Sequence, residues 1–178
     1  AAIAGSVVVK EDGCYYNRFY FVRPDGTVTY YDKKHLFTYG GEHERFTAGD
    51  RRVVIEFRGV RIMLLVCYDL RFPIWSRNHG DYDMILYVAS WPTPRVQAWK
   101  SLLVARAIEN QCYVAGVNRV GRDPYNEYDG GSMVVDPYGK VIASCEDGAE
   151  MTASAEVDMP ALEAFRVKFP VLDDSDVL

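Results

Sequence analysis

Short apolar stretches separated by turn-forming residues run along most of the chain and predict a fold rich in β-strands. Residues 60–66 and 84–89 are almost continuously apolar, which is typical of strands that are covered on both faces of a sheet. Asp12-Gly13 and Pro24-Asp25-Gly26 are turn sequences between the first expected strands, which form a hairpin. The expected strands are 7–10, 14–22, 28–31, 51–57, 60–66, 84–89, 112–117, 132–136, 140–144 and 152–157.

Three segments have the features of helices. Residues 95–110 form the clearest one, because apolar residues such as Trp99 and Leu103 recur at helical spacing. Residues 73–79 begin with a proline, which suits the first turn of a helix, and stop before Gly80. A last helix is expected over residues 160–168. Strands and helices together predict an α/β or α+β layered domain with its helices outside, and residues 1–178 are expected to form a single domain.

Composition narrows the class of protein. The chain has 178 residues, of which 49% are hydrophobic and 25% charged, a profile typical of a globular protein with a real core. The net charge of −5 argues against nucleic acid or an anionic membrane as the main partner. No apolar run approaches the roughly 20 residues of a transmembrane helix, and no signal peptide opens the sequence.

The four cysteines are Cys14, Cys67, Cys112 and Cys145. They are widely spaced and form no C-x-x-C pair, so the sequence predicts neither a zinc site nor a thioredoxin-like motif. A chain of this size does not need disulfides, and we therefore expect reduced thiols and a cytoplasmic location.

The first residues are unusual for a chain terminus. The sequence opens without methionine on a run of small and β-branched residues, 1–9, which predicts a buried strand. Natural termini are more often polar and loose. We therefore expect that an upstream segment is missing.

Cys67 stands where an apolar strand runs directly into a helical pattern. Such a junction predicts a sharp turn that exposes the side chain at a sheet edge and directs backbone N–H groups at a reaction centre. A helix N-terminus beside the sulfur would also favour the thiolate. For the other three cysteines a buried structural role is expected, since free cysteine is among the most buried residues.

A reactive thiolate needs a positive neighbour, and Lys33 lies just past the end of an expected strand. A glycine-bent turn that carries Glu42 follows. Taken alone, both segments are equally typical of solvated surface loops.

Four motifs in order resemble those of the nitrilase (carbon–nitrogen hydrolase) superfamily, and most closely its ω-amidase branch, which hydrolyses 2-oxoacid amides such as 2-oxoglutaramate. The motifs are Tyr-Asp-Lys-Lys-His-Leu-Phe at 31–37, Gly-Glu at 41–42, Val-Cys-Tyr-Asp-Leu-Arg-Phe-Pro at 66–73 and Ala-Arg-Ala-Ile-Glu-Asn-Gln at 105–111. The resemblance extends over essentially the whole chain. It implies an α+β fold, a four-layer αββα sandwich whose N-terminal portion is missing here.

The resemblance also implies a Cys-Lys-Glu triad. Cys67 takes the place of the nucleophile, Lys33 that of the lysine and Glu42 that of an auxiliary glutamate in the loop between them. The triad glutamate that acts as general base lies before the lysine in this family, and no residue here matches it. Glu11, in a turn, does not fit. The backbone N–H of Tyr68 and the Lys33 ammonium are expected to hold the oxyanion.

Other residues near these motifs allow two interpretations each. Trp91 follows a buried strand end, so it either walls the substrate pocket or packs in the core. Arg71 and Asp69 are expected to pair and hold the turn. Arg95 and Arg119 could bind a substrate carboxylate, but the sequence favours a solvated arginine at either position.

Three functions follow from the sequence. The first is hydrolysis of small linear ω-amides of dicarboxylates through a thioester, the second a related amide or carbamoyl hydrolase, and the third a catalytically inactive fragment or structural subunit that lacks the base. Members of the superfamily commonly dimerise through outer helices, so a homodimer or higher homo-oligomer through the 95–110 helix and the helix after Cys67 is expected by analogy. The expected partner is a small-molecule amide, and no cofactor or metal is implied.

Overall fold

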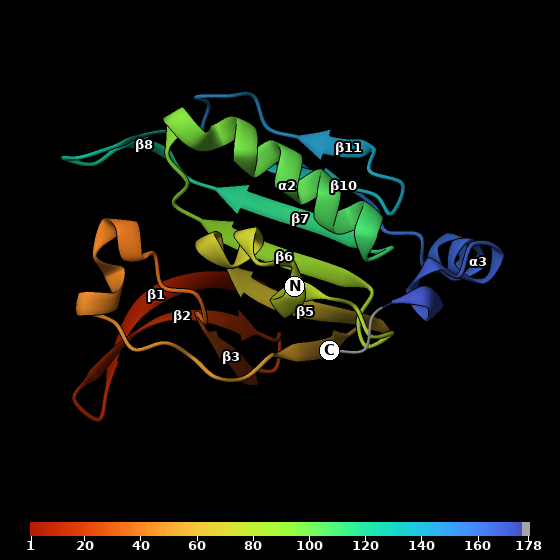
Figure 1. Ribbon diagram of the computed structural model, residues 1–178, viewed down its shortest axis with the longest axis horizontal. Helices are drawn as coiled ribbons and strands as arrows, with labels where there is room; N and C mark the ends of the chain where they lie inside the picture. The colour runs from red at the N-terminus through yellow and green to blue at the C-terminus, as the bar shows by residue number, and fades with distance from the viewer. Residues whose placement is uncertain (176–178) are drawn as a thin grey trace.

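A six-stranded mixed sheet forms the centre of the computed structural model, which describes residues 1–175 (Figure 1). The strand order is β11-β10-β7-β6-β5-β4. β5, β6 and β7 are parallel, whereas the three outer strands run antiparallel to their neighbours. The strands are β4 (Val54–Phe57), β5 (Val60–Val66), β6 (Met84–Ala89), β7 (Tyr113–Asn118), β10 (Met133–Val135) and β11 (Val141–Ser144). Because the parallel strands are central, their carboxyl ends meet at one edge, where ligands bind in open α/β sheets.

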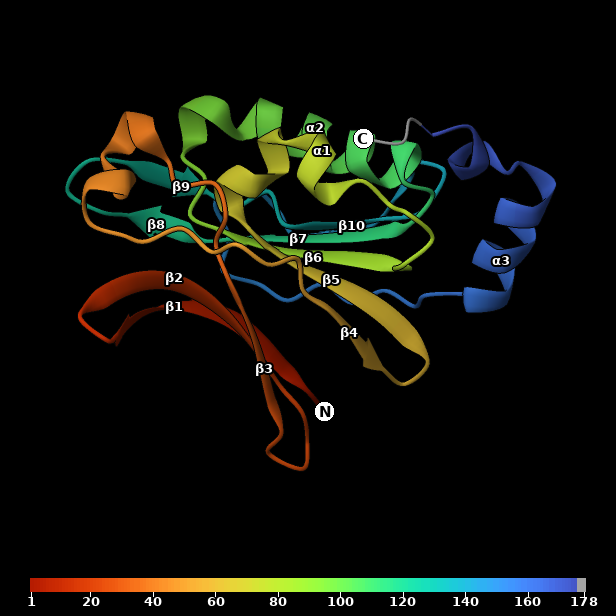
Figure 2. The same cartoon turned by 60° about the horizontal axis from the view of Figure 1, so that its bottom comes forward.

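A smaller antiparallel sheet packs on one face of this sheet, and helices cover the other face (Figure 2). The smaller sheet contains β1 (Ile3–Glu11), β2 (Cys14–Val22) and β3 (Val28–Asp32). The helices are α1 (Pro73–Ser76), α2 (Val96–Glu109) and, beyond the end of the sheet, α3 (Met159–Lys168). The described residues thus form helix, sheet and sheet layers of an α+β sandwich, in agreement with the expected fold class.

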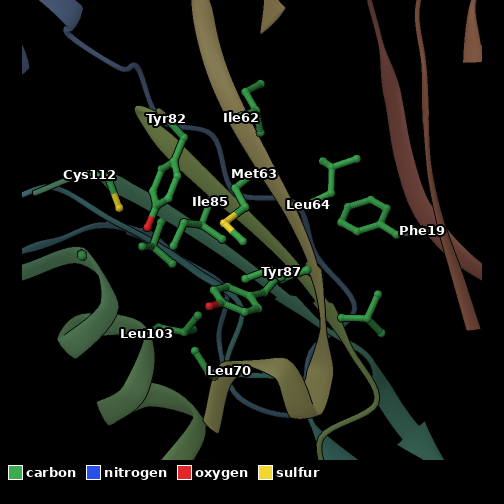
Figure 3. Close-up of a cluster of buried hydrophobic side chains, with 14 of the residues drawn as sticks. Phe19, Ile62, Met63, Leu64, Leu70, Tyr82, Ile85, Tyr87, Leu103 and Cys112 are labelled. Carbon is green, nitrogen blue, oxygen red and sulfur yellow. The ribbon is translucent and has the colours of Figure 1, made fainter. Parts of the chain in front are cut away.

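The core lies on both faces of the large sheet (Figure 3). Phe19 from β2 and Leu64 from β5 meet between the two sheets, and both are fully buried. Tyr87 and Leu103 pack on the opposite side, under the helices. This two-sided burial is the physical reason for the continuous apolar run of β5.

Two expected strands differ in the structure. β1 forms, but it is an edge strand paired only with β2 among the described residues, and Ile3 is 75% exposed rather than buried. The expected strand 152–157 is an extended segment without strand pairing, and most of its residues are exposed. Apolar composition predicts that a segment is extended, whereas pairing depends on a neighbouring strand.

Turns and helix ends also differ from the expectations. Between β7 and β10, where no strand is expected, lies a hairpin of β8 (Val120–Arg122) and β9 (Glu127–Asp129). Helix α1 ends at Ser76 instead of residue 79, because the buried Asn78 side chain accepts hydrogen bonds from the Gly80 and Asp81 N–H groups and so favours a turn.

Within residues 1–175, no helix combines the length and apolar character needed to cross a membrane. Short 3₁₀ helices are η1 (Thr38–Gly40), η2 (Glu42–Glu44), η3 (Cys67–Arg71), η4 (Thr93–Arg95) and η5 (Val171–Asp174).

Candidate active site

Cys67 occupies a strained turn at the carboxyl end of β5. It is the first residue of η3, and its φ angle is +47°. Non-glycine residues in the left-handed region cost about 1–3 kcal/mol and cluster at functional sites. The sharp strand-to-helix turn that the sequence predicts is therefore present, and its strain marks Cys67 as a candidate nucleophile.

Lys33 and Glu42 form a close ion pair, so they do not lie on two separate solvated surface loops. Lys33 follows β3, and its Nζ lies 2.5 Å from Oε2 of Glu42, the first residue of η2. The same oxygen accepts a hydrogen bond of 2.6 Å from the Phe37 N–H, and Oε1 accepts one of 3.1 Å from Asn17 Nδ2. The Lys33 side chain is only 3% exposed. A buried ammonium with a fixed partner can serve as an immobile positive charge.

One cavity of about 520 Å³ connects these groups. Lys33, Glu42 and Cys67 all line it, together with Tyr68 and Trp91, so the structure brings all five predicted site residues to the same hollow. Within the described part of the chain, Glu42 is the only acidic residue in its wall. The cavity is large enough for a small linear substrate.

Burial raises the pKa of the Cys67 thiol, and this effect outweighs the Lys33 ammonium and the Ser90 carbonyl contact, which both lower it. The sulfur lies 4.0 Å from that carbonyl oxygen. Desolvation thus opposes the thiolate that a helix N-terminus is expected to favour, and only the short helix η3 begins here.

Trp91 both packs in the core and lines the cavity. Its ring lies 5.6 Å from that of Trp99, centroid to centroid, and its Nε1 donates to the Arg95 carbonyl at 2.7 Å. Its backbone is fixed from both sides by Asn118 at the end of β7, whose Oδ1 accepts from the Trp91 N–H and whose Nδ2 donates to the Trp91 carbonyl. The two interpretations of Trp91 are thus compatible.

Arg71 and Arg95 line the same cavity. For Arg71 the sequence predicted a different role, namely a pair with Asp69 that holds the turn. Arg71 does not pair with Asp69; its guanidinium lies 5.0 Å from the centre of the Trp91 ring. The Arg95 guanidinium lies 5.5 Å from the centre of the Phe37 ring. Among residues 1–175, neither guanidinium has a carboxylate partner or a hydrogen-bond acceptor. Arg119 lies over Tyr128 and does not line this cavity.

Among the cavity residues that sequence reasoning did not single out are Asn126 and Tyr128. Both come from the β8–β9 hairpin, which has no local pattern that links it to the cysteine. In the part of the chain that the structure describes, no group of three or more His, Cys, Asp or Glu side chains is placed to hold a metal ion.

The geometry places a cysteine at a strained turn and a buried lysine–glutamate pair in the wall of one cavity. The carbon–nitrogen hydrolase family matches residues 1–167, and the chain belongs to this family. It is 52% identical to omega-amidase YafV of Escherichia coli K12, over 99% of this chain and 69% of that protein. It is 42% identical to 2-oxoglutaramate amidase of Bacillus subtilis strain 168, over 97% of this chain and 67% of that protein.

Solved structures agree with this assignment. XC1258 from Xanthomonas campestris, a CN-hydrolase superfamily protein with an arsenic adduct in its active site, matches with a TM-score of 0.95 and 43% identity, over 99% of this chain and 70% of that chain. The resemblance to the superfamily and the expected fold are thereby confirmed.

Proposed function

We propose that this protein hydrolyses the terminal amide of small dicarboxylic acid monoamides, such as 2-oxoglutaramate, to the acid and ammonia through a thioester on Cys67. The observation that carries this proposal is a single cavity that combines Cys67, the Lys33–Glu42 pair and the guanidinium groups of Arg71 and Arg95, which have no partner among the described residues. The names of the omega-amidase and 2-oxoglutaramate amidase relatives support the substrate class.

The first half of the reaction forms the thioester. Cys67 Sγ attacks the amide carbonyl carbon, and its proton passes to a carboxylate base. The Lys33 ammonium and the Tyr68 N–H stabilise the tetrahedral oxyanion. The base then protonates the amide nitrogen, the C–N bond breaks and ammonia leaves. The family resemblance assigns the base role to a triad glutamate without a matched position in this sequence, and Glu42 holds Lys33 in place.

The second half releases the acid. A water molecule attacks the thioester carbonyl while the base takes one of its protons. The same two donors stabilise the second oxyanion. When the C–S bond breaks, the proton returns to the sulfur, and the site regains its protonated thiol. This resting state agrees with the burial that raises the pKa of Cys67.

The arginines define which amides fit. Arg71 and Arg95 each lie against an aromatic ring and line the cavity, and among residues 1–175 their N–H donors have no acceptor. A guanidinium pairs with a carboxylate in a bidentate manner, and such charge-assisted bonds are among the strong ones. A substrate with a distal carboxylate would satisfy these donors, whereas a neutral amide would leave them unpaired.

Ammonia release by the full-length protein tests the proposal. We expect turnover of 2-oxoglutaramate and succinamate, and at least about tenfold lower kcat/KM for pentanamide, which lacks the carboxylate. Arg71→Gln and Arg95→Gln should narrow this difference. Cys67→Ala should abolish release, and rapid acid quenching of the wild-type reaction should trap an acyl adduct on the Cys67 peptide. Equal activity on pentanamide would contradict the substrate class, and preferential turnover of an N-carbamoyl compound would favour the carbamoyl hydrolase alternative.

An intact mass measured on the same sample separates the enzyme from an inactive subunit. Ammonia release by protein of the full-length mass supports the amidase. The absence of release from folded protein with any of these amides would favour the structural role.

The outer surface of the helices supports a homodimer. Ile74 on α1 and Ile108 on α2 are 70% and 51% exposed, on the face of the large sheet that the helices cover. Light scattering should give a dimer mass, and Ile74→Asp with Ile108→Asp should give a monomer.

The four free thiols support a cytoplasmic location, because an oxidising compartment would consume the nucleophile.

A further inference from the structure

Asp69 accepts four hydrogen bonds from three different segments of the site. This carboxylate lies in η3, two residues after Cys67, and is 0% exposed. Its Oδ2 accepts from the Val66 N–H at 3.0 Å and from the Tyr31 hydroxyl at 2.8 Å. Its Oδ1 accepts from the His35 N–H at 2.9 Å and contacts His35 Nδ1 at 2.8 Å. Four such donors are enough to occupy all the lone-pair directions of a carboxylate.

The donors flank the two groups that the proposed reaction requires. Val66 is the residue before Cys67, so its bond to Asp69 closes the strained turn that carries the sulfur. Tyr31 and His35 lie two residues before and two residues after Lys33. One buried side chain therefore ties the cysteine turn to both sides of the lysine segment, although the residues that it joins are 34 and 38 positions apart.

Aromatic packing fixes the direction of the imidazole. The His35 ring stacks on Phe72, with the ring centroids 3.8 Å apart and an interplanar angle of 9°. Trp75 meets the same ring edge-on at 6.0 Å, and its Nε1 donates to the Tyr31 hydroxyl at 3.2 Å. The ring is thus held with Nδ1 toward the carboxylate, and the network continues into α1.

We infer that Asp69 is a positioning residue, which with His35 sets the distance and angle between the Cys67 sulfur and the Lys33 ammonium. This inference rests on the proposed function of those two residues. Asp69 does not line the cavity and does not reach substrate. Its effect is expected in the chemical step, because a displacement of about 1 Å between catalytic groups can lower the rate about 10²-fold.

Asp69→Asn tests the inference in the full-length protein. The asparagine amide has only one accepting oxygen. Its NH₂ group would replace the other carboxylate oxygen and face the N–H or O–H donors that bind there. We expect kcat for ammonia release to fall about 10²-fold while KM changes less than about threefold. The matched control is Asp83→Asn, a second buried carboxylate that binds Arg61 and Arg166 away from the cavity. This control should lower stability and leave kcat of the folded protein near the wild-type value.

His35 variants provide a second test that does not alter the buried charge. Phenylalanine keeps the stacking on Phe72 but removes the donor, so His35→Phe should lower kcat at least about tenfold. Asparagine places an N–H close to the position of Nδ1, so His35→Asn should restore kcat to within about threefold of the wild type. A residue needed only for folding would not show this rescue at matched melting temperatures.

The outcomes separate the two proposals. Ammonia release by Cys67→Ala at the wild-type rate would overturn the proposed function. An inactive Cys67→Ala variant, together with folded Asp69→Asn or His35→Phe variants of wild-type kcat, would overturn only the positioning role. Equal losses of kcat in Asp69→Asn and Asp83→Asn would also overturn it, because the effect would then follow from burial alone.

Discussion

Replacing Lys33 by methionine separates its proposed catalytic role from its structural one. The ammonium lies 2.5 Å from Glu42 Oε2, and the side chain is almost fully buried. Methionine keeps an unbranched apolar stem of similar length, so packing is largely retained while the charge is removed. Catalysis and folding stability should both suffer, for different reasons.

The magnitudes follow from the contacts. Loss of one oxyanion donor lowers kcat about 10²–10³-fold. Breaking a buried ion pair from one side costs about 3–5 kcal/mol. Glu42 keeps its hydrogen bonds from Phe37 and Asn17, so we expect the lower end of that range. For a domain of this size, about 3 kcal/mol corresponds to a fall in Tm of roughly 6–12 °C.

The assay measures ammonia release and thermal unfolding on three variants. Lys33→Met should lose both activity and stability. Adding Glu42→Gln removes the unpaired charge, so the double variant should regain stability but not kcat. The control is Lys34→Met, whose ammonium lies 5.4 Å from the Trp75 ring centre and outside the cavity wall. Wild-type kcat in Lys33→Met, or recovery of kcat in the double variant, would refute the assigned role.

Three further measurements test the site and the fold. Because the pKa of Cys67 is raised, its alkylation by iodoacetamide should still accelerate beyond the pH at which an ordinary cysteine levels off, and a plateau near neutral pH would contradict the burial argument. Gly116→Ala places a Cβ 2.5 Å from Leu103 Cδ1, so it should destabilise by about 1–3 kcal/mol, whereas Gly5→Ala, with open space around it, should change Tm little. Asp158 caps α3 by accepting from the Ala161 N–H, so Asp158→Ala should cost about 1 kcal/mol in urea unfolding, and an unchanged midpoint would exclude a stabilising cap.

Local patterns were sufficient for the elements that carry the site. The run 60–66 matches β5, and the helix expected over 95–110 matches α2 within one residue at each end. The sharp turn at Cys67 followed from the same information, because a strand that runs directly into a helix leaves few backbone conformations for the junction. The motifs added Lys33 and Glu42, whose local sequence is equally typical of a surface loop.

Only the tertiary structure decided how these residues meet. The pairing of Lys33 with Glu42, the aromatic contact of Arg71 and the four bonds of Asp69 join segments whose spacing follows no local period. Strand pairing likewise depends on which strands are neighbours. It is missing at 152–157 among the described residues and present in the β8–β9 hairpin between 119 and 130.

The physical reason is the range of the interactions. Hydrophobic periodicity and turn chemistry act between residues a few positions apart, and the sequence by itself determines them. Burial of the Cys67 thiol, which raises its pKa, depends on everything that packs around it. The candidate nucleophile was therefore predictable from its strand and turn, whereas the burial that raises its pKa and its meeting with Lys33 in one cavity were set by the assembled fold.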